Sequence, residues 1–393
     1  MSEDIVLVSG VRTAIGRFGG SFVETPASDL GSAVIREAVK RAGIEPGQVD
    51  QVVMGCVGQV AEDAYIARHA AIDAGLSIET PAYTVNRLCG SGLEAITTAA
   101  RWIMTGEAEI VVAGGTENMT LLPYYDRSAR FGLRMGNGVL EDGIPILLSD
   151  PFLRYHMGVT AENLAKQYDL KREELDVYSV ESHRRAIAAM SAGKFKDEIV
   201  PIEVKVGREK KIADTDEHPR ADSSIERMGN LKPAFQEGGM VTPGNSSGVN
   251  DGAAAVVMMT AKKAAELGLK PRLRLVGSAV AGVDPAIMGS GPIPATRKVF
   301  ERTGVKRDEL DVIELNEAFA SVALACSREL ELDPERTNPN GGAVALGHPV
   351  GATGAILTVK LMHELARTGG HYGLVSLCIG GGQGISAIFE NVN

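Results

Sequence analysis

Two cysteines nearly three hundred residues apart each introduce a glycine-rich turn. Cys89 lies in NRLCGSG and Cys378 in LCIGGGQG, and His348 lies between them in GGAVALGHPVGATG. One thiol could attack a carbonyl, the imidazole could accept its proton, and the second thiol could move another proton. The neighbouring glycines would let backbone N–H groups approach a developing oxyanion. The pattern therefore predicts acyl chemistry that begins with attack by a thiol.

The sequence around Cys89 predicts a strand, a turn and a helix. A short run at 83–88 precedes the cysteine, and an amphipathic helix is expected over 91–106. This placement exposes a nucleophile at the end of a sheet, and a helix N-terminus would lower the pKa of its thiol. A small buried core residue is the alternative for Cys89. For His348, between Gly347 and Pro349, the alternative is a structural turn histidine.

Cys378 and Asn316 each follow a predicted apolar strand. Cys378 could equally pack in the core, and Asn316, which could hold a water or a ligand, could be a turn residue. The glycine run after Cys378 lacks GxGxxG spacing, so we reject a dinucleotide site. The other histidines lack metal-ligand spacing, and Cys56 and Cys326 are expected to be buried, so we expect no metal.

Composition favours an enzyme of ordinary domain size. The chain has 393 residues, 46 glycines and only 5% aromatic residues, which is typical of a tightly packed α/β protein of two to three domains. A net charge of −10 argues against nucleic acid as a partner. No CxxC spacing, signal peptide or membrane-length apolar run is found, and the expected location is the cytoplasm.

Apolar runs alternate with amphipathic segments in the first 115 residues, which predicts a largely parallel sheet covered on both faces. The chain is then richer in charge and turns over 120–250, with helices expected at 161–168 and 175–190 and a loop at 205–221. A helix is expected near 253–267, where the chain would return to the first domain.

The second half repeats the order of the first. DQVVMGC (50–56) is matched by DVIELNE (311–317), and EIVVAGG by LVSLCIGGG. We interpret this as a duplicated α/β unit with a site at the seam between the halves. The predicted domains are an N-terminal domain (1–119 and 250–270), an inserted α+β loop domain (120–249) and a C-terminal domain (271–393).

Several motifs together resemble the thiolase family: NRLCGSG, HMG (156–158), NEAFA (316–320), GGAVALGHPVGATGA and CIGGGQG, in order from Val6 to Glu390. Bacterial acetyl-CoA acetyltransferases and broad-specificity β-ketothiolases are the most similar branch. The resemblance implies two mixed, largely parallel sheets with helices in layers, related by a pseudo-two-fold. It also implies reversible Claisen condensation of acyl-CoA with acetyl-CoA, and CoA-dependent thiolysis of 3-ketoacyl-CoA, without a cofactor.

The resemblance also implies roles for single residues. Cys89 would be acylated while His348 accepts its proton, and Cys378 would deprotonate a second acetyl-CoA. His348 and a water held by Asn316 would stabilise the enolate, and the N–H groups of Cys89 and Gly380 would form a second oxyanion hole. The implied CoA- and substrate-binding residues are Arg220, Ser247, His156, Met157, Met288 and Phe319.

Two positions near the expected CoA contacts, Pro243 and Arg227, differ from many relatives. Family members are usually tetramers of tight dimers, and 127–135 matches the loop that joins dimers, so we expect a homotetramer. Ketoacyl synthases, with one cysteine and two histidines, are disfavoured by Cys378, as are hydroxymethylglutaryl-CoA synthases, which use Cys, Glu and His. A silent CoA-binding scaffold would be expected to lack Cys89, His348 or Cys378. A regulatory Cys89–Cys378 disulfide would require Cα atoms within about 7 Å.

Overall fold

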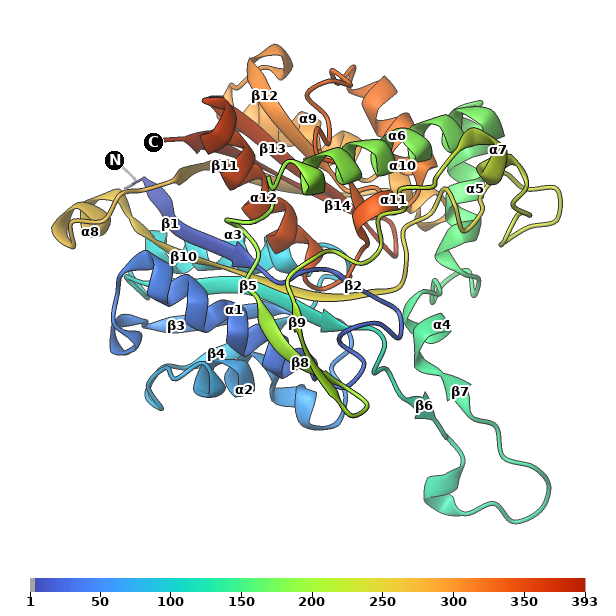
Figure 1. Cartoon of the computed structure of the whole chain (residues 1–393), viewed down its shortest axis with the longest axis horizontal. Coiled ribbons are helices and arrows are strands. Elements are labelled where there is room, and N and C mark those ends of the chain that lie inside the picture. Colours follow the sequence, from blue (N-terminus) through green and yellow to red (C-terminus); the bar gives the residue numbers. More distant parts are fainter. Residues whose placement is uncertain (1–3, 393) are drawn as a thin grey trace.

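The computed structural model describes residues 4–392 and has a mixed α/β fold (Figure 1). Residues 1–3 and 393, which the predicted domain limits include, lie outside the described residues. The first half contains β1 (Ile5–Arg12), β2 (Gly16–Arg17), α1 (Ala27–Ala42), β3 (Gln51–Gly55), α2 (Ile66–Asp73), β4 (Ala82–Val85), α3 (Ser91–Thr105), β5 (Val111–Asn118), β10 (Asn250–Thr260) and α8 (Ala261–Glu266). The segment between β5 and β10 contains β6 (Tyr124–Tyr125), β7 (Glu141–Asp142), α4 (Gly143–Leu147), α5 (Met157–Gln167), α6 (Arg172–Ser191), β8 (Ile202–Val206), β9 (Glu209–Ala213) and α7 (Ile225–Gly229). The second half contains β11 (Leu273–Gly282), α9 (Pro292–Thr303), β12 (Leu310–Leu315), α10 (Ala320–Glu329), α11 (Ala343–Leu346), α12 (Thr353–Thr368), β13 (Tyr372–Ile379) and β14 (Gln383–Asn391).

The strands of the two halves follow the same order, which confirms the internal duplication. In the first half β1 pairs with β10, β10 with β5, and β5 with β3; in the second β11 pairs with β14, β14 with β13, and β13 with β12. In each half the first two of these pairs are antiparallel and the third is parallel. The matched segments DQVVMGC and DVIELNE thus form β3 and β12, at equivalent places in the two halves.

The strand directions differ from the expectation of two largely parallel sheets. The two halves are joined through β1 and β11, which pair at only two positions, so the strands form one continuous sheet of ten. Most neighbouring pairs are antiparallel, and the parallel ones are β3–β4, β3–β5 and β12–β13. Apolar runs reveal that a strand is buried on both faces, but they carry no information about its direction.

Two helices, α3 and α12, form the central layer between the two halves (Figure 1). Their apolar residues pack in one cluster with residues from strands of both halves, and each buried Leu or Ile contributes about 1.5–3 kcal/mol. Glycines bring the two backbones close together, because a methyl group at Gly354 would lie 2.3 Å from the Leu93 nitrogen. Outer helices α1 and α2 cover one half, and α9 and α10 cover the other.

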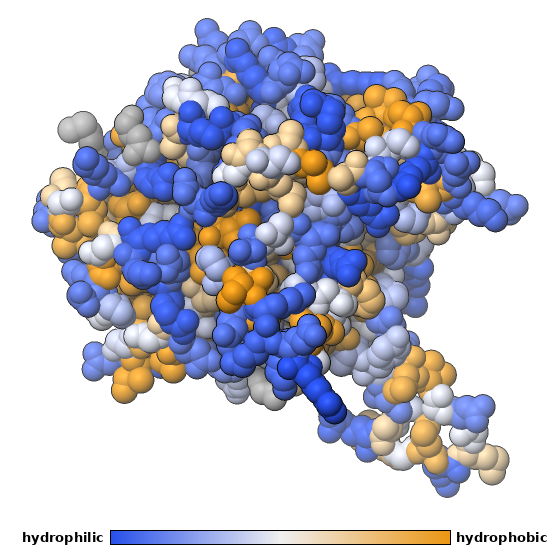
Figure 2. Space-filling view, viewed as in Figure 1, coloured by the Kyte–Doolittle hydropathy of each residue, from blue (hydrophilic) through white to orange (hydrophobic). Residues whose placement is uncertain are grey.

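The segment between β5 and β10 differs in part from the sequence expectation. The prediction of a helix near 253–267 is wrong, because β10 occupies 250–260 and only the short α8 follows it. The polar stretch at 205–221 is partly a hairpin of β8 and β9 rather than loop alone. The residues between β6 and β7 project away from the rest of the chain (Figure 1), and their surface carries hydrophobic side chains (Figure 2).

Candidate active site

Cys89 lies on a tight turn between β4 and α3, as the sequence predicted. Leu88, just before it, has a φ of 46°, a left-handed conformation that is uncommon for a residue with a side chain. The Ser91 hydroxyl fixes this turn by donating to the Leu88 carbonyl at 2.6 Å and accepting from the Arg87 N–H at 2.8 Å. The turn leaves Cys89 half-buried, ahead of the first turn of α3.

The prediction that the helix N-terminus lowers the pKa of the Cys89 thiol is wrong in sign. Burial raises the pKa of the Cys89 thiol to about 11, although the N–H groups of Gly380 and of Cys89 itself favour the thiolate. Loss of water outweighs these donors because a thiolate is poorly stabilised among apolar side chains. Because the Gly380 N–H interacts with the Cys89 sulfur, it faces that sulfur. The turn at Cys89 and the turn after Cys378, nearly three hundred residues apart in sequence, therefore lie together. Both Cys89 and Cys378 are free thiols.

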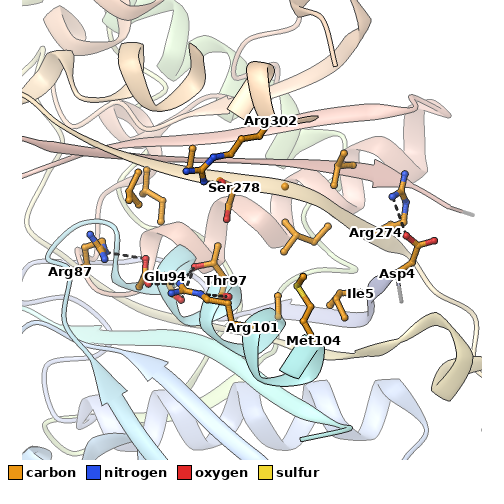
Figure 3. Close-up of a pocket in the computed structure, with 17 residues that line it drawn as sticks. Asp4, Ile5, Arg87, Glu94, Thr97, Arg101, Met104, Arg274, Ser278 and Arg302 are labelled. Atoms are coloured by element: carbon orange, nitrogen blue, oxygen red, sulfur yellow. Dashed lines mark hydrogen bonds and ion pairs between the residues drawn. The ribbon is translucent and has the colours of Figure 1, made fainter. Parts of the chain in front are cut away.

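A charged cluster supports the Cys89 turn from behind. Glu94, which is buried on α3, pairs with Arg87 at 3.0 Å and with Arg101 at 2.6 Å. Figure 3 shows these side chains at one end of a cavity of about 490 Å³ between α3 and β11. Arg87 also donates to Gln383 at 3.2 Å, at the start of β14. Cys89 does not line this cavity, so we assign the cluster a supporting role.

His348 is buried and held at three points. Its backbone N–H donates to Asn250 at 3.1 Å, its Nδ1 lies 2.7 Å from the Thr353 hydroxyl, and its Nε2 lies 3.3 Å from Asn316 Nδ2. The Thr353 hydroxyl donates its proton to the Pro349 carbonyl, so it must accept from Nδ1–H. Nε2 therefore carries the lone pair. Burial lowers the pKa of His348 to about 4, so the ring is neutral at pH 7.

Asn316 and Cys378 lie at the ends of the neighbouring parallel strands β12 and β13. The Asn316 N–H donates to the Ser376 carbonyl at 2.9 Å, which sets the two strand ends side by side. Both side chains are fully buried. Asn316 Oδ1 has no hydrogen-bond partner among the described residues, so it is free to accept from a ligand. Burial, followed by the nearby Cys89, raises the pKa of Cys378 well above its usual range.

An apolar cavity of about 530 Å³ lies beside the Cys89 turn. Leu88, which precedes Cys89, and Met157 line it, whereas Cys89 itself does not. The Met157 methyl group would lie 3.2 Å from a methyl group at Gly380, so this wall borders the Gly380 amide. Cys89 packs in the same apolar cluster as several of the cavity's residues, namely Val57, Val60, Leu122 and Leu147. The cavity offers space for an apolar group bound to the Cys89 sulfur.

The other predicted acyl-pocket residues gather beside Cys378. Met157, Met288, Phe319 and Cys378 belong to one apolar cluster. The His156 ring stacks on Phe235 with centroids 4.7 Å apart, and Phe235 meets Phe319 edge to face at 6.1 Å. His156 also caps α5 by accepting from the Gly158 N–H at 3.0 Å, and burial lowers its pKa.

The predicted CoA-binding residues lie on two adjoining loops. Ser247 donates its N–H to the Ala318 carbonyl at 3.0 Å, which places it next to Phe319. Arg220 is exposed, and its N–H donates to His183 Nδ1 at 3.1 Å. The ring of His218, two residues before Arg220, would lie 2.6 Å from a methyl group at Gly248. The two loops are therefore in contact, with a guanidinium at the exposed side.

Sequence reasoning missed three residues that hold the site. Asn250 and Thr353 fix His348 through the contacts described above. Glu317 accepts from Tyr178 at 2.9 Å, Ser182 at 2.7 Å and the Val344 N–H at 3.1 Å. It thereby ties α6 to α11, just before His348. A carboxylate at the end of a buried strand was the signal that could have indicated this anchor.

Comparison with known proteins agrees with this geometry. Residues 5–262 match the Thiolase, N-terminal domain family and residues 269–391 match the Thiolase, C-terminal domain family. The chain belongs to the thiolase family. This thiolase is 53% identical to the beta-ketothiolase BktB of Cupriavidus necator, over 100% of both chains.

Solved thiolase structures share the whole fold. A crystal structure of the Bacillus anthracis acetyl-CoA acetyltransferase has a TM-score of 0.98 and 46% identity, covering 100% of this chain and 99% of that one. Human mitochondrial 3-ketoacyl-CoA thiolase in complex with CoA has a TM-score of 0.96 and 42% identity, covering 99% and 98%. Among residues 4–392 of this thiolase, no helix combines the length and hydropathy needed to cross a membrane.

Proposed function

We propose that this thiolase is an acetyl-CoA C-acetyltransferase and β-ketothiolase. It condenses an acyl-CoA with acetyl-CoA through an acyl-Cys89 intermediate, and it catalyses the reverse, CoA-dependent thiolysis of 3-ketoacyl-CoA. The observation that carries the proposal is that two thiols, a neutral imidazole and the Gly380 amide meet at the ends of β12 and β13 and the start of α3. Relatives named for these activities match the full length of the chain.

In the first half-reaction the Cys89 sulfur attacks the thioester carbonyl. His348 Nε2 accepts the thiol proton and keeps it, and the departing CoA sulfur takes the proton of Cys378, which leaves Cys378 as a thiolate. The N–H groups of Cys89 and Gly380 point toward the Cys89 sulfur and would donate to the oxyanion that forms beside it. The apolar cavity next to Cys89 receives the acyl group.

In the second half-reaction Cys378 removes a proton from the methyl group of acetyl-CoA. The carbanion attacks the acyl carbon, the Cys89 thiolate leaves, and His348 returns the proton to the Cys89 sulfur. The enolate oxygen gains charge, and it would be stabilised by the Nε2–H of His348, which still carries the Cys89 proton, and by a water bound to Asn316 Oδ1. An acceptor with no protein partner suits such a water, which would donate one hydrogen to Oδ1 and the other to the enolate.

The bound CoA would extend from this centre to the surface past the adjoining loops of Ser247 and Arg220. His156, Met157, Met288 and Phe319 would enclose the acyl and pantetheine groups. We assign CoA recognition mainly to the loop domain (120–249), which is inserted in the N-terminal domain (1–119 and 250–270), while Met288 and Phe319 belong to the C-terminal domain (271–393). A cytoplasmic homotetramer joined through the projecting hairpin completes the proposal.

The test is thiolysis of acetoacetyl-CoA and of 3-ketohexanoyl-CoA, with kcat/KM measured for each. Activity on acetoacetyl-CoA is expected, and a large preference for it would define a short pocket. Comparable rates would define a broad β-ketothiolase and would make Met157 the first residue to examine. No thiolysis of either substrate, together with no acetyl adduct on the Cys89 peptide after incubation with acetyl-CoA, would contradict the proposal.

A further inference from the structure

Glu117 is a buried carboxylate for which the reaction described above has no role. It is the penultimate residue of β5, and its side chain has no exposed surface. A buried carboxylate is costly unless hydrogen bonds compensate for the lost water. Burial raises the pKa of Glu117, while surrounding backbone N–H groups act in the opposite direction. The surrounding N–H groups therefore hold the carboxyl group at a fixed place.

Three backbone hydrogen bonds reach this carboxylate from two other segments. The N–H groups of Val57 and Gly58, just after β3, donate to it at 2.9 and 2.8 Å. The N–H of Gly351, in the turn between His348 and α12, donates to it at 2.8 Å. Glu117 thus connects β5, the loop after β3 and the turn that carries His348.

The turn at Gly351 is enclosed on every side. A methyl group at Gly351 would lie 2.5 Å from a Glu117 oxygen, and the Gly351 carbonyl lies 2.3 Å from where a Gly115 methyl group would be. The same carbonyl approaches a Gly92 methyl position at 3.2 Å, in the first turn of the helix that follows Cys89. The position of this turn therefore sets the distance between the His348 segment and the Cys89 segment.

Glu117 also acts on Cys89 through its charge. The ionisable groups nearest the Cys89 turn are Glu117 on β5, His348 before α12, Cys378 on β13, Cys56 after β3, and the paired Arg87 and Glu94 behind the turn. His348 and the other two thiols are held neutral by burial. Burial is the main cause of the raised pKa of Cys89, the N–H groups of Gly380 and Cys89 act against it, and Glu117 adds the smallest contribution, in the same direction as burial.

We propose that Glu117 is a positioning residue for acyl transfer, which holds the His348 turn against the Cys89 turn through its three backbone hydrogen bonds. Its charge also adds to the effect of burial, which keeps Cys89 in the thiol form in the free enzyme. The proton then leaves Cys89 only as His348 accepts it during attack. This inference rests on the proposed function, because positioning of these turns matters only if they perform acyl transfer.

The test uses Glu117→Gln and two readouts on the full chain. The first is the rate at which iodoacetamide alkylates Cys89 between pH 7 and 11, followed by mass analysis of the Cys89 peptide. The second is kcat and KM for thiolysis of acetoacetyl-CoA. Loss of the charge is expected to move the alkylation midpoint down by about 0.3 pH unit, a roughly twofold faster reaction near pH 8, because burial remains the main cause of the raised pKa. Loss of the hydrogen bonds is expected to lower kcat about tenfold or more with KM little changed.

Two further variants separate the charge from the positioning. Glu117→Asp keeps the charge on a shorter arm, so it should retain the wild-type alkylation midpoint and still lose kcat. Glu162→Gln is the matched control, because Glu162 is also fully buried and accepts from the Met240 and Val241 N–H groups at 2.9 and 2.8 Å. It should leave the midpoint unchanged.

An unchanged midpoint in Glu117→Gln, or an equal shift in Glu162→Gln, would overturn the electrostatic part. Wild-type kcat in Glu117→Asp would overturn the positioning part, and this variant remains informative if Glu117→Gln does not fold. Alkylation needs no turnover, so a wild-type protein without thiolysis would refute the proposed function while leaving the charge effect measurable.

Discussion

The Nδ1 atom of His348 lies 2.7 Å from the hydroxyl of Thr353, which itself donates to the Pro349 carbonyl. A single hydroxyl thereby selects the tautomer that leaves Nε2 free to accept a proton. Because Thr353 is the first residue of α12, the helix fixes the hydroxyl and the hydroxyl fixes the ring. The imidazole is oriented by a neutral group rather than by a carboxylate, so it gains no charge-based increase in basicity.

Thr353→Val should lower kcat by roughly ten- to a hundredfold, because the valine cannot accept from Nδ1–H and the tautomer is no longer fixed. Thiolysis of acetoacetyl-CoA measures the effect. Thr353→Ser keeps the hydroxyl and should recover most of the rate. Equal loss in both variants would indicate that packing of the methyl group, and not the hydrogen bond, is what matters.

The roles of Cys89 and Cys378 should be distinguishable by experiment, because each thiol is proposed to act in a different half-reaction. Cys378→Ser should still form an acetyl adduct on Cys89 when it is incubated with acetyl-CoA, whereas condensation should fall by about 10²-fold or more because the second proton transfer is lost. Cys89→Ala should show neither adduct nor condensation. Intact-mass analysis beside a condensation assay checks both. An adduct on Cys378 in the Cys89→Ala protein would reverse the proposed assignment.

Cys89 should react slowly with alkylating agents at neutral pH. Burial raises its pKa to about 11, so the thiolate is the minor form below that pH and its fraction should grow about tenfold for each unit of pH. Iodoacetamide kinetics between pH 6 and 10 provide the measurement. A plateau reached by pH 8 would show instead that Cys89 and His348 form a thiolate–imidazolium pair in the free enzyme.

The projecting hairpin should control assembly. Phe131 and Met135 are 90% and 96% exposed, and with the exposed Leu133 they group hydrophobic side chains on one projecting loop, as a protein interface does. Replacing both with serine should reduce the proposed tetramer to a smaller species, as determined by light scattering after gel filtration. Ile212→Ser, an exposed apolar residue on β9 at 55%, is the matched control and should leave the mass unchanged.

The residues around the proposed chemistry could be predicted from the sequence because glycine motifs are local. Each of the four residues lies beside a turn or strand end that can be recognised from a few neighbouring residues: Cys89, His348, Asn316 and Cys378. The pKa of Cys89 could not be predicted, because its sign depends on burial created by distant segments. Thr353 and Glu117 were missed for the same reason: each acts through a partner that only the folded chain brings near.

The strand β10 could not be identified from its sequence either. The segment DGAAAVVMMT is rich in alanine and methionine, which favour helix, and a strand buried on both faces has no alternating pattern to contradict that reading. Tertiary packing decided the outcome, since the small alanines allow β10 to fit between β1 and β5 while helices cover both faces.

The central place of β10 has a consequence for how the chain is made. β1 and β5 leave the ribosome early, but the strand that separates them follows only after the segment from 119 to 249. At typical synthesis rates this delay is on the order of ten seconds. During this time the β10-facing edges of β1 and β5 are unpaired, so the two strands can pair incorrectly with each other or with neighbouring nascent chains. Chaperone dependence, and aggregation of any fragment truncated before residue 260, would be the visible result in the cell.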